Sequence, residues 1–141
     1  MFAKLFVGFL VVVAVLAGYL WSNQAEIVDN VNEQRSLERE QSQQAGRLFG
    51  EKNDQNACLT RTLADFDGCQ EFGCSVSSGL FLKNCLAVAA PNSALCEGVP
   101  AFQEVPSEDD KHWAKYECID RNIRGEACRM LMRQVSQFCS Q

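Results

Sequence analysis

Cysteine is the residue type in this chain whose number and spacing could carry chemistry. Eight cysteines fall within the last 84 residues, and five of the seven intervals between neighbours are ten or eleven residues. They are Cys58, Cys69, Cys74, Cys85, Cys96, Cys118, Cys128 and Cys139. Eleven residues turn an α-helix through three turns plus roughly 20°, so cysteines at this spacing on one helix share a face. The spacing therefore predicts short helices joined by disulfides.

Neither thiol catalysis nor metal binding fits this spacing. Redox-active cysteines normally form a C-x-x-C pair at a helix start, where the helix dipole lowers the pKa of the attacking thiol, and no such pair occurs. Structural zinc sites take their ligands in close pairs, usually with histidines, whereas this chain has only His112. We therefore predict no enzyme activity and no catalytic, metal or cofactor site, and interpret all eight cysteines as disulfide-bonded.

The same geometry limits how the cysteines pair. Cysteines three turns apart on one helix are separated by about 16 Å, whereas a disulfide needs a Cα separation of about 4.4 to 6.8 Å. Cys128 therefore cannot pair with Cys139 if they share a helix. We expect one bridge from Cys118 to the last helix, one from Cys85 and one from the loop that holds Cys96, with the remaining connectivity open.

The residues between the cysteines predict an all-α domain, residues 53–141, with about four short helices. Asn53 or Asp54 can cap a first helix that runs to about residue 66, and Ser77 or Ser78 can cap a second, residues 79–90. Ser107 precedes a third helix with three carboxylates in its first turn, which favour the positive end of the helix dipole. A fourth helix covers residues 126 to about 140, with both its cysteines on the apolar face.

Residues 1–21 form an apolar segment of a different kind. Between Phe2 and Trp21 only Lys4 is charged, and twenty helical residues span roughly 30 Å, the hydrocarbon thickness of a bilayer. We predict a single transmembrane anchor that is retained as a signal-anchor. The alternative is a cleaved signal peptide with Val15-Leu16-Ala17 before the cut, which would leave an apolar N-terminus on the mature protein.

The charges on either side of this segment predict its orientation. Lys4 is the only cation on the N-terminal side, while Glu26, Asp29 and Glu33 precede any further cation after the span. The positive-inside bias places the N-terminus in the cytoplasm, and an even number of cysteines suits an oxidising compartment. We therefore predict a single-pass protein of the inner (cell) membrane with a periplasmic or extracellular C-terminal domain.

A polar block, residues 22–52, separates the anchor from the cysteine-rich domain. It is rich in Gln, Glu, Asn and Arg and contains no proline, which favours a helix, but its apolar residues keep no heptad register. We interpret it as a helical stalk. The stalk either pairs with a second copy, giving a homo-oligomer, or serves as a solvated spacer.

Charge and loop composition indicate the kind of partner. The net charge of −5, with no cluster of basic residues among aromatics, argues against nucleic-acid binding. The loop before Ser107 carries Val99, Phe102 and Val105 as candidate contacts to another protein. The expected function is an interaction or structural subunit of an envelope complex; the alternatives are a helical binder of an apolar ligand or lipid and a thiol-redox accessory protein.

Overall fold

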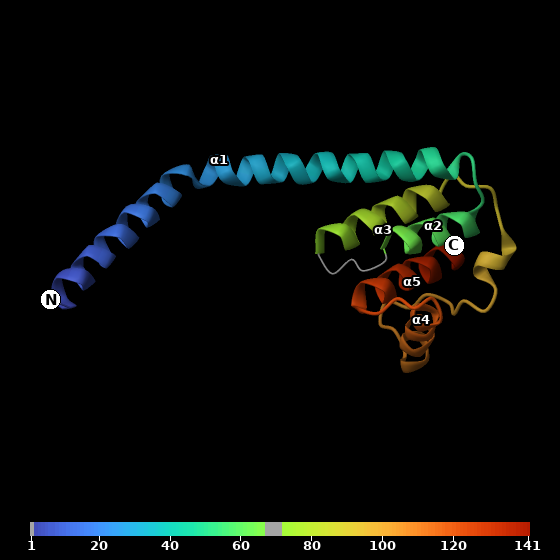
Figure 1. The fold of residues 1–141 in the computed structure, drawn as a ribbon. Coiled ribbons are helices and arrows are strands. Elements are labelled where there is room, and N and C mark those ends of the chain that lie inside the picture. Colours follow the sequence, from blue (N-terminus) through green and yellow to red (C-terminus); the bar gives the residue numbers. More distant parts are fainter. Residues whose placement is uncertain (1, 67–71) are drawn as a thin grey trace. The chain divides into compact units, whose positions relative to one another are not determined.

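In the computed structural model the regular elements of the chain are helices. The structure describes residues 2–66 and 72–141, and of residues 2–5, 7, 23, 25, 27 and 72 it describes the backbone alone. The elements are α1 (Phe2–Gly50), α2 (Gln55–Phe66), α3 (Phe72–Leu86), the 3-10 helix η1 (Ser93–Cys96), α4 (Glu108–Asp120) and α5 (Glu126–Cys139) (Figure 1). No strand occurs in these described ranges, which agrees with the predicted all-α class.

Contacts between residues divide the chain into two units, residues 1–37 and residues 38–141. The first unit is the long N-terminal part of α1, and its described apolar side chains between Phe6 and Trp21 are exposed. Within the described residues, no helix is long and apolar enough to cross a bilayer. The anchor predicted at residues 1–21 therefore has no support here and stays a prediction.

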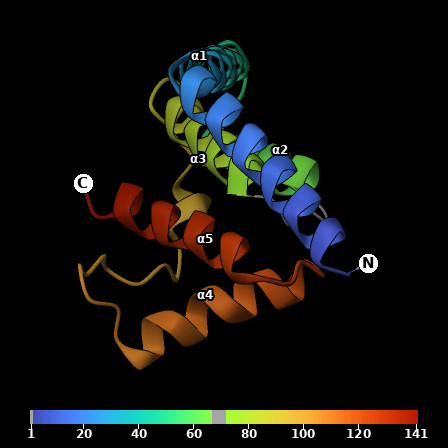
Figure 2. The same ribbon diagram turned by 90° about the vertical axis from the view of Figure 1, so that its left-hand side faces the viewer.

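The second unit is built from two helix pairs that pack on each other. Helices α2 and α3 pack together, α5 packs against α3, and α4 packs against α5 and lies below it at an angle in the view of Figure 2. Each helix contributes apolar side chains to one core because their spacing puts them on the inward face. The core includes Leu59, Leu63 and Phe66 of α2, Leu82 of α3, and Leu131, Met132 and Val135 of α5.

The last turns of α1 belong to this second unit. A Cβ atom added at Gly46 would lie 2.4 Å from the carbonyl oxygen of Phe81, and one added at Gly50 would lie 2.5 Å from that of Cys85. The ring of Phe49 also packs 5.9 Å, centroid to centroid, from that of Phe81. A stalk was predicted at residues 22–52 and a domain from residue 53 onward. The compact unit instead begins at Glu38. The two glycines account for this difference, because they let two helix backbones meet.

Helix α3 has different bounds from the predicted second helix. The helix was expected at residues 79–90 behind a serine cap, but it begins at Phe72 and ends at Leu86, so Ser77 and Ser78 lie within it. Residues 87–90 leave the helix because the chain pairs with the start of α2. The Ala90 N–H donates to the Asn53 carbonyl at 3.0 Å, and the Gln55 N–H donates to the Ala90 carbonyl at 3.1 Å.

The predicted caps of the other helices agree with the structure. Asp54 caps α2, because its Oδ1 accepts the Ala57 N–H at 2.8 Å while its Oδ2 accepts from the Asn92 amide at 3.0 Å. The hydrogen bonds from the Ala57 N–H and the Asn92 amide stabilise the ionised carboxylate, so the pKa of Asp54 lies below its ordinary value. Asp54 thereby ties the start of α2 to the loop after α3.

Candidate functional site

Disulfides hold the helices of the second unit in place, and we call this set of bridges the disulfide frame. Cys58 of α2 bonds to Cys85 of α3, with Cα atoms 5.8 Å apart, and both side chains are fully buried. Cys118 bonds to Cys128 and thereby joins α4 to α5. Two of the three expected attachments, from Cys85 and from Cys118 to the last helix, are therefore present.

The third bridge fastens the long loop between α3 and α4. Cys96 at the end of η1 bonds to Cys139 at the end of α5, with Cα atoms 5.5 Å apart. Cys74 is also disulfide-bonded, and Cys69 lies outside the described residues. No described cysteine is free, and no group of three or more candidate metal ligands occurs among the described residues. Each of these three bridges joins two different elements, as the helix geometry requires.

The three loop residues named as candidate partner contacts do not form one exposed patch. Val99 packs against the core, and Phe102 is half-buried, with the Arg133 guanidinium 5.5 Å from its ring centroid. Only Val105 is open, at 82% exposure. The Phe102 N–H also donates to Ser140 Oγ at 2.8 Å. Most of this loop therefore covers α5, and Val105 is the one member of the set that a partner could contact directly.

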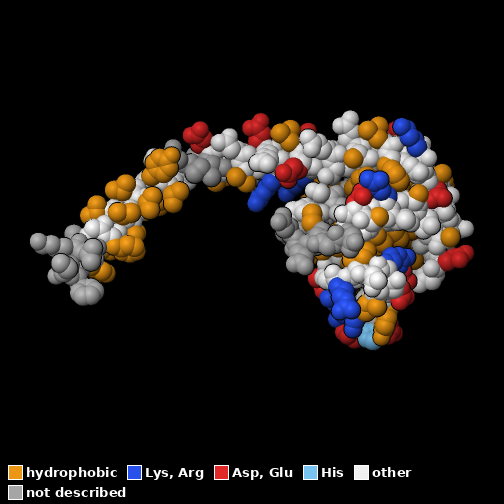
Figure 3. Space-filling view, viewed as in Figure 1, with side chains coloured by type: hydrophobic (Ala, Val, Ile, Leu, Met, Phe, Trp, Pro, Cys, Tyr) orange, Lys and Arg blue, Asp and Glu red, His pale blue; other side chains and the backbone are white. Residues whose placement is uncertain are grey.

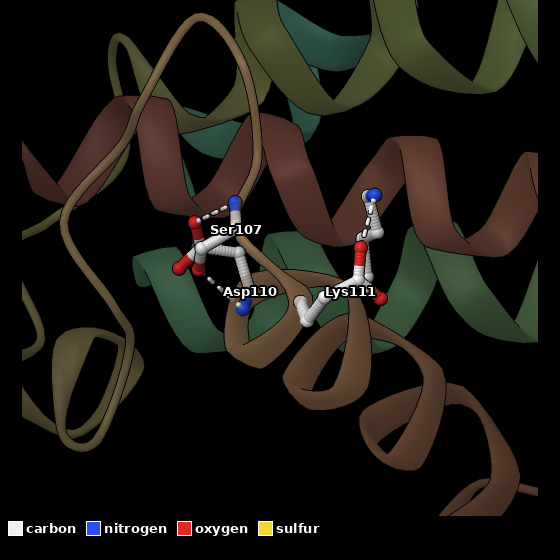
Figure 4. Close-up of polar contacts among 4 residues, drawn as sticks. Ser107, Asp110 and Lys111 are labelled. Carbon is white, nitrogen blue, oxygen red and sulfur yellow. Dashed lines mark hydrogen bonds and ion pairs between the residues drawn. The ribbon is translucent and has the colours of Figure 1, made fainter.

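The acidic residues before His112 act as a helix cap. Ser107 Oγ accepts the Asp110 N–H at 3.2 Å, and the Ser107 N–H donates to the Asp110 carboxylate at 2.8 Å (Figure 4). Lys111 pairs with Glu108 at 2.7 Å, and this contact lowers the pKa of Glu108. The side chain of His112 is exposed, with its ring 5.8 Å from that of Tyr116. The first turn of α4 is thus stabilised as the sequence predicts.

Two hollows of the second unit have linings of mixed character, each with a net charge of only one unit. One, about 440 Å³, lies between α1, α2 and α3, where Glu38 and the Arg61–Asp65 ion pair line it beside Ser77 and Ser78. The other, about 600 Å³, lies between α3 and α5 and is lined by four glutamines, Lys83 and apolar side chains that include Leu86 and Phe138. Neither hollow has a single dominant chemical character.

A third hollow, which we call the α4–α5 hollow, differs from both in its charge. It has a volume of about 390 Å³ and is lined chiefly by Lys115, Ile119, Asn122, Ile123, Arg124 and Arg129. Three of these side chains are cations, and the lining includes no carboxylate. This hollow was not predicted from the sequence, because its residues come from α4, the following turn and α5. Only the fold brings them together. The one signal was the density of Lys and Arg between residues 111 and 133.

Comparisons with models of protein families, with curated proteins and with solved structures found no match for this chain. The chemistry of its own residues is therefore the basis on which a function can be argued.

Proposed function

We propose that the protein is a membrane-tethered interaction subunit that displays its disulfide-stabilised unit, residues 38–141, on the outer side of the inner membrane. The observation that carries this proposal is the disulfide frame. Bridges such as Cys58–Cys85 and Cys96–Cys139 persist in oxidising compartments and are rare where glutathione and thioredoxin keep thiols reduced. A domain held together in this way is suited to the periplasm or the cell exterior.

The tether is supported by the character of the N-terminal helix. The described side chains from Phe9 to Leu16 include seven large apolar residues, and all seven are exposed on every side of α1. A helix that is apolar all round needs an apolar environment, which a bilayer supplies. Figure 3 shows these apolar side chains along the first part of α1. The single cation Lys4 supports a cytoplasmic N-terminus, because positive residues are enriched on that side of a membrane.

A binding role is supported by apolar side chains that the second unit leaves exposed. Val105, Tyr116, Ile119 and Met130 all have more than two-fifths of their surface accessible. Exposed apolar groups bordered by charged residues are typical of surfaces that contact another protein. We therefore assign to this unit the role of an accessory subunit that holds a partner of the cell envelope.

The tether and its orientation are tested by fractionation. The full chain is expected to stay with membranes after carbonate extraction, and a membrane-impermeant amine reagent added to spheroplasts is expected to label the exposed Lys52 and Lys111. A variant that lacks residues 2–21 is expected to be absent from the membrane pellet. Carbonate extraction of the full chain to the same extent as that variant would overturn the tether.

The binding role is tested by photo-crosslinking in intact cells. A photoreactive phenylalanine analogue at Val105 or Tyr116 is expected to give a discrete adduct with one envelope protein, since both side chains are exposed. The analogue at the exposed Lys52 serves as a control for collisions at the membrane surface. The same adduct pattern from all three positions, or none from any, would contradict a specific partner surface.

The two alternative functions have narrower support. Binding of an apolar ligand is favoured by the hollow between α3 and α5, where Leu86 and Phe138 offer apolar surface, although four glutamines surround them. A redox role is favoured by the partial exposure of Cys96 and Cys139, because reductants reach accessible disulfides first. Neither alternative accounts for the exposed apolar groups on α4 and α5.

A further inference from the structure

We infer that the α4–α5 hollow binds an acidic peptide segment of a partner protein, in which carboxylates are flanked by apolar side chains. The inference deepens the proposed function by giving the chemistry of the partner, and it rests on that function only in taking the occupant to be part of a protein. The charge, the shape and the rigidity of the hollow support it.

The hollow is positively charged, although the chain as a whole is acidic. The protein has 13 Lys and Arg against 18 Asp and Glu, yet three cations and no carboxylate line this hollow. Arg129 pairs with Glu126 at 2.7 Å. Lys115 and Arg124 make no ion pair or hydrogen bond with any described residue, so both are open to an anionic ligand. Carboxylates form strong charge-assisted hydrogen bonds with such groups.

The floor of the hollow is apolar and would suit side chains next to a carboxylate. Ile123 is buried beneath it, while Ile119 is 45% exposed and available for contact. A ligand that places a carboxylate at the cations and an aliphatic group on Ile119 would bury apolar surface, which favours binding. The hollow therefore selects for both features together.

The turn that forms one wall of the hollow is held in place by the frame. The Cys118 carbonyl accepts the Arg121 N–H at 3.2 Å and the Ile123 N–H at 2.9 Å, and the Cys118–Cys128 disulfide joins α4 and α5, the helices on either side of this turn. Asn122 and Gly125 adopt positive φ angles of 61° and 118°, which reverse the chain between α4 and α5. Because the wall is already ordered, a ligand loses little free energy in ordering it.

The size of the hollow favours a short peptide segment over other anions. A volume of about 390 Å³ fits two or three side chains, whereas a long acyl chain would find only two isoleucines and a disulfide to cover it. A nucleic acid would be repelled by the net charge of −5 and would find only three cations in the hollow, so its binding is disfavoured. An acidic segment with flanking leucines matches the charge, the apolar area and the volume.

The inference is tested by NMR titration of the full chain in detergent micelles with a blocked Leu-Glu-Glu-Leu peptide. The amide signals of Ile119, Asn122 and Gly125 are expected to shift and saturate. The matched Leu-Gln-Gln-Leu peptide is expected to bind at least about tenfold more weakly, because it keeps the shape and loses the charge. Raising the salt concentration is expected to weaken binding of the acidic peptide only.

Charge-reversal variants locate the site. Lys115→Glu combined with Arg124→Glu is expected to weaken binding of the acidic peptide by at least about tenfold. The matched control is Arg39→Glu combined with Lys52→Glu, which changes the net charge equally at exposed positions of the same unit outside the hollow, and it is expected to keep near-normal binding. A thiol assay that finds no free thiol, with an unchanged melting temperature, shows that both variants are folded.

Several outcomes would overturn the inference. One is a peptide titration that gives no saturable shifts, and another is equal binding of the peptide by the two double variants. A third is tighter binding of octanoate, a fatty acid with one free carboxylate, than of the peptide, which would assign the hollow to a free carboxylate. Failure of the peptide titration leaves the fractionation result unaffected, and failure of membrane retention leaves the titration unaffected. The two proposals therefore fail separately.

Discussion

At the scale of single residues, Gly46 and Gly50 are the positions where the fold depends most sharply on residue type. They lie four residues apart on α1 and meet Phe81 and Cys85, which are four residues apart on α3. Small residues at this spacing form a flat strip that lets helix backbones approach closely, in water as in membranes. This contact brings the end of α1 into the second unit.

We predict that Gly46→Ala and Gly50→Ala each lower the free energy of unfolding of the second unit by about 1 to 3 kcal/mol, because the new methyl group collides with backbone that cannot yield. Thermal unfolding of the full chain in detergent under non-reducing conditions measures the effect. Gly73→Ala is the matched control, since its Cβ would meet nothing within 4 Å and alanine favours a helix. Equal melting temperatures for all three variants would contradict the close contact.

The fold favours the ionised form of Asp54. Its carboxylate accepts one bond from the α2 backbone and one from Asn92, and its pKa is lowered from the ordinary value of 3.8. Ionised Asp54 therefore contributes stability above pH 3.8, and this contribution is lost as the pH falls through the lower folded-state pKa.

We predict that Asp54→Asn reduces the stability of the protein at neutral pH and that the difference from the original chain shrinks as the pH falls below 3.8. The amide keeps an acceptor for the Ala57 N–H but cannot ionise, so the variant separates the charge from the cap. Melting temperatures measured between pH 7 and pH 2.5 test this. A difference that stays constant over that range would show that the charge of Asp54 is irrelevant.

At the scale of elements, the disulfides make up for a small apolar core. Cys96–Cys139 links residues 43 apart in sequence and attaches the loop before α4 to the end of α5. A cross-link across a long stretch restricts the unfolded chain more than one across a short stretch, such as Cys118–Cys128 with a separation of 10. Each bridge is placed where two elements would otherwise separate easily.

We predict that Cys96→Ala combined with Cys139→Ala lowers the free energy of unfolding by about 2 to 4 kcal/mol, as measured by denaturant titration. Both cysteines are only partly buried, so alanine leaves little cavity and the loss reports on the cross-link itself. Complete reduction of the original protein is expected to abolish most helical signal of residues 55–139. Full helicity in strong reductant would contradict the structural role of the disulfides.

At the scale of the whole molecule, we expect folding of the second unit to depend on an oxidising compartment, because its disulfides persist only there. We predict that a variant lacking residues 2–21 accumulates as a reduced, protease-sensitive chain in a reducing cytosol. The same variant fused to a cleavable signal peptide is expected to become protease-resistant and free of thiols in the periplasm. Thiol alkylation with mass spectrometry measures the difference. A stable, fully reduced cytosolic form would contradict the dependence on oxidation.

Local chemistry allowed several features to be predicted. The caps at Asp54 and Ser107, the helices around them and the exclusion of same-helix cysteine pairs all follow from residues within a few positions of one another. The bounds of α3 were wrong because the turn after Leu86 is set by hydrogen bonds between Ala90 and the start of α2, far away in sequence. Val99, Phe102 and Val105 were predicted as contacts from their hydrophobic character alone. The half-buried Phe102 lies beneath the guanidinium of Arg133, a residue of α5 that is distant in sequence.

The sequence by itself determined an all-α chain with many cysteines, its acidic charge and the start of most helices, because these depend on composition and near neighbours. Only the tertiary structure decided which cysteines pair, that the two glycines of α1 meet α3, and that Lys115, Arg124 and Arg129 surround one hollow. These features depend on contacts between residues tens of positions apart. Such contacts are set by the packing of whole helices, which no local pattern of residues encodes.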